Sequence, residues 1–77
     1  MNLLLPQTRT GTVRAATRLD IHGDRYVDLS LALDDEPGPP VTGRIGAGEC
    51  PEALAPGDRV SARFVMGTLV KVVRLEQ

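Results

Sequence analysis

The stretch over residues 8–33 decides the fold. It consists of T-R-T-G-T-V-R-A-A-T-R-L-D-I (8–21), then H-G-D (22–24), then R-Y-V-D-L-S-L-A-L (25–33). Small or apolar residues alternate with polar ones through the first and third parts, which is the pattern of a half-buried β-strand. The H-G-D segment breaks the alternation, and Gly23 can adopt a positive φ in a tight turn. The stretch therefore predicts one long antiparallel hairpin.

The alternation also predicts which side chains of the hairpin face the core. On the first strand the predicted inward residues are Gly11, Val13, Ala15, Thr17, Leu19 and Ile21, and the predicted outward residues are Thr10, Thr12, Arg14, Arg18 and Asp20. On the second strand they are Val27, Leu29, Leu31 and Leu33 inward, with Tyr26, Asp28, Ser30 and Asp34 outward.

Three further strands follow the hairpin. The D-D-E-P-G-P-P segment over 34–40 predicts an exposed loop, because proline and glycine cannot sustain a strand ladder there. Alternation resumes over 41–47, with Val41, Gly43 and Ile45 inward. Residues 48–55 are the one candidate for a helix, of one or two turns, before Pro56 and Gly57 end it. The last strands are expected over 58–66 and 69–75.

This order of elements resembles the OB-fold, a five-stranded Greek-key barrel with a helix between its third and fourth strands. The resemblance covers residues 8–75, and it includes Pro56-Gly57-Asp58-Arg59-Val60 as a tight entry into the fourth strand. It implies an all-β, five-stranded OB-like barrel with one short helix between strands 3 and 4. It also implies a ligand-binding surface on the first three strands.

Length and composition bound the remaining possibilities. The chain has 77 residues, 42% hydrophobic and 25% charged, and its formal net charge is −1. It is expected to form a single domain over 1–77, with residues 1–7 as an N-terminal extension. A near-neutral chain is not a strongly cationic nucleic-acid binder. One cysteine and one histidine provide neither a disulfide nor a zinc site.

We therefore predict a non-enzymatic protein with no catalytic residues, no metal and no cofactor. His22 lies in the predicted turn, and Cys50 lies beside the candidate helix, far along the chain from it. Neither residue has a recognisable partner for nucleophilic or acid–base chemistry. We expect His22 to be a solvated polar side chain and Cys50 to be a small buried one.

The predicted binding residues are Arg14, Arg18, Tyr26 and Arg44, on the outer surface of the first three strands. Arginines beside one aromatic ring form a minimal site for single-stranded nucleic acid. Asp20 and Asp28 lie among them, so a solvated surface with interstrand Arg–Asp pairs is the alternative interpretation. Single-stranded nucleic acid is the first functional hypothesis, by analogy with the fold.

The second hypothesis is a protein-interaction or assembly module. Both faces of the last predicted strand are largely apolar, with Val70 and Val72 on one and Leu69, Val73 and Leu75 on the other. Another copy could cover Leu69, Val73 and Leu75, which predicts a homodimer through this edge. The alternative cover is the chain's own segment Leu3–Leu5.

Two fragments resemble other families. Arg14-A-A-T-Arg18 with Asp28-L-Ser30 is similar to motifs of the PilZ family, which implies cyclic di-GMP binding, although Leu33 occupies the place of the family's glycine. G-T-V (11–13) and L-A-P-G-D-R-V (54–60) are similar to TOBE domains, which implies an oxyanion ligand. Both hypotheses rank below the first two.

We expect no secretory signal, because the apolar run Leu3–Leu5 is short and ends at Pro6, and no apolar run in the given sequence is long enough to span a membrane. We therefore expect a cytoplasmic protein without a membrane partner.

Overall fold

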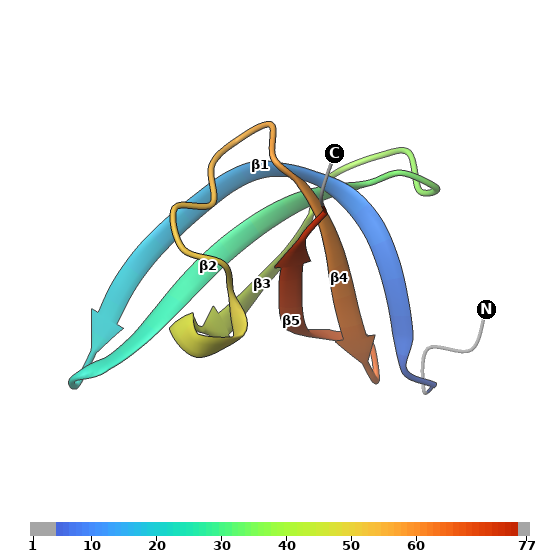
Figure 1. The fold of residues 1–77 in the computed structure, drawn as a ribbon. Coiled ribbons are helices and arrows are strands. Elements are labelled where there is room, and N and C mark those ends of the chain that lie inside the picture. The colour runs from blue at the N-terminus through green and yellow to red at the C-terminus, as the bar shows by residue number, and fades with distance from the viewer. Residues whose placement is uncertain (1–4, 76–77) are drawn as a thin grey trace.

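The predicted hairpin is the longest part of the structure, a computed structural model that describes residues 5–75 (Figure 1). Strands β1 (Gln7–Ile21) and β2 (Asp24–Leu33) pair antiparallel. His22 and Gly23 connect them with φ values of 53° and 87°. Positive φ at both central positions defines a type I′ turn, whose twist matches that of the flanking strands.

The other strands add to both sides of this hairpin. They are β3 (Val41–Gly46), β4 (Arg59–Val65) and β5 (Thr68–Arg74), and a 3₁₀ turn, η1 (Ala47–Glu49), follows β3. All five strands form one antiparallel sheet in the order β3-β2-β1-β4-β5, which confirms the all-β prediction. Within residues 5–75 no ladder of backbone hydrogen bonds joins β3 to β5, so closure into a barrel is not detected.

The core lies on the concave side of the sheet, under the arch that β1 and β2 form in Figure 1. Every strand contributes to it, and Leu54 adds a side chain from the segment between η1 and β4. The buried apolar residues are Val13, Val27, Leu29, Leu31, Leu33, Ile45, Leu54, Val60, Ala62, Phe64, Leu69 and Val72.

A β-bulge at Arg14 overturns part of the predicted pattern. Val13 pairs with Leu31 and Ala15 pairs with Ser30, so Arg14 is an extra residue in β1. A one-residue insertion moves every later side chain to the opposite face of the sheet. Ala16, opposite Leu29, therefore packs against the core. The prediction that Ala15, Thr17, Leu19 and Ile21 face inward is wrong, because it assumed an unbroken alternation.

A second bulge occurs in β5, at Val70. Phe64 pairs with Leu69 and Arg63 pairs with Lys71, which leaves Val70 without a partner on β4. Leu69 and Val72 are consequently both buried, whereas Val70 and Val73 are exposed. The prediction that Leu69 shares a face with Val73 is wrong for this reason.

The helix expected over 48–55 is only the 3₁₀ turn. Pro51 disfavours helical backbone at the preceding residue, and Cys50 is extended, with φ −135° and ψ 138°. Ala53 adopts a φ of 57°, which also interrupts a right-handed helix. The segment returns to the sheet where the amide of Gly57 donates to the carbonyl of Val13, at 2.8 Å.

The acidic loop over 34–40 is exposed, as predicted, and arginines of the sheet hold its acids. Arg59 donates two hydrogen bonds of 2.6 Å to the carboxylate of Asp34. Arg9 lies 2.6 Å from Asp35 and 2.8 Å from Glu36. These ion pairs tie the loop to β1 and β4.

Candidate nucleic-acid interface

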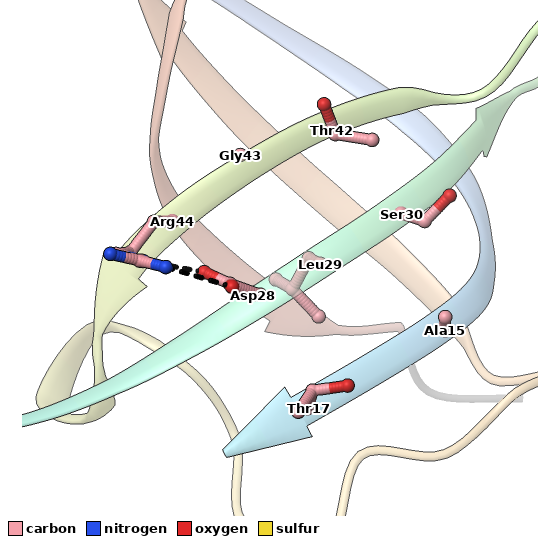
Figure 2. Close-up of a pocket in the computed structure, with 8 residues that line it drawn as sticks. All are labelled: Ala15, Thr17, Asp28, Leu29, Ser30, Thr42, Gly43 and Arg44. Carbon is pink, nitrogen blue, oxygen red and sulfur yellow. Dashed lines mark hydrogen bonds and ion pairs between the residues drawn. The ribbon is translucent and has the colours of Figure 1, made fainter. Parts of the chain in front are cut away.

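A shallow hollow of about 540 Å³ lies on the outer face of β1, β2 and β3 (Figure 2). Directly opposed residues of neighbouring strands point to the same side of a sheet. Thr17, Asp28 and Arg44 are opposed in this way, as are Ala15, Ser30 and Thr42. We call this surface the outer hollow. Its lining residues are Ala15, Thr17, Asp28, Leu29, Ser30, Thr42, Gly43 and Arg44.

The charged part of the outer hollow is an ion pair between neighbouring strands. Arg44 donates from Nε to Oδ1 of Asp28 at 2.7 Å and from Nη2 to Oδ2 at 3.0 Å. These hydrogen bonds lower the pKa of Asp28. The outer hollow is thus electrically balanced, and it offers hydroxyl groups together with the remaining N–H groups of Arg44.

A second cleft, of about 420 Å³, lies between the end of the β1–β2 hairpin and the segment after β3. We call it the hairpin cleft. Arg18 and Arg25 bring two positive charges to it, Asp20 and Glu52 bring two negative ones, and Tyr26 contributes an aromatic ring. The amide of Gly23 donates to Oδ1 of Asp20 at 2.9 Å, which holds that carboxylate at the turn.

Arginines fasten the segment that forms the other wall of the hairpin cleft. Arg18 donates from Nη2 to the carbonyl oxygen of Pro51 at 2.9 Å. Arg74 donates to the carbonyl oxygen of Glu52 at 3.1 Å. The two side chains reach this segment from β1 and β5, so they hold residues 51 and 52 across the opening of the sheet.

The structure brings together only some of the predicted binding residues. Arg18 and Tyr26 line the hairpin cleft, and Arg44 lines the outer hollow. Arg18 lies opposite Val27, on the core side of β1, because the bulge reverses its direction. Arg14 is the exposed bulge residue itself and lines neither surface.

Tyr26 lines the hairpin cleft. Its place on β2 puts it on the same face of the sheet as Asp28 of the outer hollow, two residues away. Arg25 and Thr42 were not among the predicted site residues. The predicted turn at 22–23 could have indicated that Arg25 lies opposite Asp20, at the end of the hairpin where the cleft forms.

The predicted dimer residues are also separated. Leu69 is 4% exposed and belongs to the core, Val73 is 45% exposed, and Leu75 is half-buried. Leu3 and Leu4, proposed as an alternative cover, lie outside the described residues, whereas Leu5 is 59% exposed. The homodimer stays a prediction.

The two residues considered for chemistry occupy different environments. His22 is exposed in its turn, and Cys50 is half-buried against the core. Burial raises the pKa of the Cys50 thiol, while the charges of Arg18 and Arg74 oppose this effect. Among residues 5–75 there is no group of three His, Cys, Asp or Glu side chains placed to hold a metal ion. None of the helical segments described is long and apolar enough to cross a membrane.

Comparisons of the chain with protein-family models, with curated proteins and with solved structures find no match.

Proposed function

We propose that this chain is a small, non-enzymatic, OB-like module that binds single-stranded nucleic acid across β1, β2 and β3. The placement of Tyr26 carries the proposal: it lines the hairpin cleft together with Arg18 and Arg25, and it lies on the same face of β2 as Asp28, the ion-pair partner of Arg44. An exposed aromatic ring suits an unpaired base, which stacks on it at about 1–3 kcal/mol per base.

The strand order supports the OB-like part of this proposal. In the order β3-β2-β1-β4-β5 the edge strands are β3 and β5, and bringing them together gives a five-stranded Greek-key barrel. Gly43 of β3 and Leu69 of β5 are in close contact. The proposed ligand surface then corresponds to the face that OB-folds use for oligonucleotides.

The charge balance of the site indicates how such a ligand would be held. Arg44 is paired with Asp28, and the hairpin cleft contains equal numbers of acids and bases. Arg18 and Arg25 of the hairpin cleft have no ion pair with any residue in the described part of the chain, so at most two phosphates would be neutralised here. Stacking and hydrogen bonds to the bases therefore supply most of the affinity. The slope of log K against log salt should be no steeper than about −2.

A fluorescence-anisotropy titration with a labelled oligothymidine tests the proposal, at salt concentrations of about 50 and 200 mM. Tyr26→Ala should weaken binding about fivefold or more, and Tyr26→Phe should retain it, because the ring provides the stacking surface. Arg63→Gln is the matched control, since Arg63 is exposed on β4, outside both the hollow and the cleft. The parent protein's failure to bind at the lower salt concentration would overturn the proposal.

A further inference from the structure

Exposed apolar side chains gather at one end of the sheet. Leu5 lies two residues before the start of β1, and Met66 lies in the β4–β5 turn. The register of β1 with β4 places the start of β1 and this turn at the same end of the sheet (Figure 1). Met66 is 66% exposed, and Val70 follows on β5. We call Leu5, Met66 and Val70 the turn patch. Its members, with Val73, are the large apolar side chains exposed among residues 5–75.

Met66 is a poor residue for its position if only the fold is considered. Its φ of 52° and that of Gly67, 78°, make the connection a type I′ turn, which favours asparagine, aspartate or glycine. A left-handed conformation strains a bulky side chain, and the exposed methionine gains no core packing in return. Neither backbone geometry nor burial therefore accounts for an apolar side chain at the tip of this turn.

Two cations lie behind the turn patch. Arg63 and Lys71 are directly opposed on β4 and β5. Like charges in this arrangement destabilise a sheet. No acidic residue occurs between positions 59 and 75. Neither Arg63 nor Lys71 has an ion pair in the part of the chain that the structure describes, whereas Arg59 and Arg74 are paired with Asp34 and Asp58.

We propose that this end of the sheet docks on an anionic lipid surface. Met66 and Arg63 are three residues apart, or about 10 Å along an extended strand. Apolar groups of interfacial proteins enter the headgroup and acyl boundary by about 5–10 Å. With Met66, at the tip of the turn patch, at that depth, Arg63 and Lys71 lie at the level of the lipid phosphates. Such docking needs no membrane-spanning helix, and it departs from the expectation of a protein without a membrane partner.

The same features disfavour two other partners. A symmetric contact between two copies through this end would bring their Arg63 and Lys71 side chains together, where like charges repel. Single-stranded nucleic acid would meet the cations, but the turn patch has no aromatic ring on which a base could stack. The apolar tip at Met66, with the two adjacent cations Arg63 and Lys71 behind it, complements an anionic bilayer in both shape and charge.

Vesicle co-sedimentation tests this docking, with phosphatidylcholine alone compared with an equimolar mixture of phosphatidylcholine and phosphatidylglycerol. The parent protein should bind the anionic vesicles selectively. Met66→Asn should weaken that binding about tenfold or more, because an apolar side chain is lost from the interface. It should leave the urea midpoint unchanged or higher, because asparagine tolerates the turn. Leu5→Ser is a second variant, which leaves every strand residue unchanged and should also weaken vesicle binding.

Arg63→Gln and Lys71→Gln should each weaken vesicle binding about fivefold. Arg25→Gln, which removes a cation from the other end of the molecule, should not weaken it. Equal binding to neutral and anionic vesicles would overturn the proposal, as would parent-like binding by Met66→Asn. Self-association in sedimentation velocity that Met66→Asn abolishes, without vesicle binding, would overturn it in favour of a second copy. Tyr26→Ala should bind vesicles normally, so this docking and the nucleic-acid site can fail independently.

Discussion

Gly43 of β3 lies against Leu69 of β5, and this contact brings together the two edge strands of the sheet. A Cβ atom on Gly43 would stand 2.9 Å from Cβ of Leu69 and 3.0 Å from its Cδ2. The absence of a side chain at Gly43 permits this approach, because a Cβ atom at such distances would clash with Leu69. No ladder of backbone hydrogen bonds joins β3 to β5 in the described residues. Leu69 is buried at this point and completes the core between the two edges.

Gly43→Ala should therefore destabilise the protein by about 1–3 kcal/mol, the range expected for overpacking a filled site. Gly46→Ala is the matched control on the same strand, because a Cβ there would have no neighbour within 4 Å. That control should be neutral or slightly stabilising. Urea denaturation of both variants measures the difference. Equal midpoints would show that the edges of the sheet are not in contact in solution.

The link between Asp34 and Arg59 should make stability depend on acid pH. Two hydrogen bonds from Arg59 and one from Thr10 lower the pKa of Asp34 to about 2. The unfolded chain then binds a proton at a higher pH than the folded protein does, so this stabilisation is present above the ordinary aspartate pKa. It is lost as the pH falls from about 5 towards 2. The urea midpoint of the parent should decrease over that interval.

Asp34→Asn should show a smaller decrease in midpoint, because its side chain cannot be protonated in this range. Asp24→Asn is the control, since Asp24 is exposed at the other hairpin end and has no ion pair within residues 5–75. The control should follow the parent. An acid dependence that is identical in parent and Asp34→Asn would contradict the assignment.

Periodicity predicted the strands well and failed where the strands contain bulges. The five strands and the acidic loop follow from alternation and from glycine and proline. The bulge at Arg14 cannot be recognised from the sequence around it, because an exposed arginine is equally acceptable at a regular outward position of a strand. The inward direction of Arg18 depends on pairing with β2, which sequence spacing alone does not specify.

The site was harder to predict than the fold, for the same reason. Arg44 was expected on the outer surface and lies there, because β3 has no bulge and keeps its alternation. Arg18 reaches the hairpin cleft from the opposite face, and its hydrogen-bond acceptor, the carbonyl of Pro51, is 33 positions away. Contacts between distant backbone and side-chain groups depend on the tertiary arrangement, so composition and spacing carry no information about them.

The reactivity of the Cys50 thiol should depend on the hydrogen bond between Arg18 and the neighbouring Pro51. Burial raises its pKa, and Arg18 partly offsets this. Arg18→Ala should raise the thiol pKa further, because a nearby positive charge is lost. It should also increase the limiting rate of thiolate modification at high pH, because the hydrogen bond to Pro51 no longer restrains the segment.

A pH series of reaction rates with an aromatic disulfide reagent separates these two effects. Arg14→Ala is the matched control, because Arg14 contacts neither Cys50 nor the segment around Pro51 in any hydrogen bond or ion pair of the described residues. A limiting rate that does not change in Arg18→Ala would show that this hydrogen bond does not restrain the segment.

Leu69→Ala and Val73→Ala should differ strongly in stability, although the two residues lie on one short strand. Leu69 is 4% exposed and fills the space between Gly43 and the core, so its truncation should cost about 2–5 kcal/mol. Val73 is 45% exposed on the outer face, and its truncation should cost less than about 1 kcal/mol in a monomer. If a second copy covers Val73, its truncation would cost more, and the melting temperature of the parent would rise with protein concentration. Thermal unfolding of both variants and the parent over a range of concentrations therefore separates a self-contained core from the predicted homodimer.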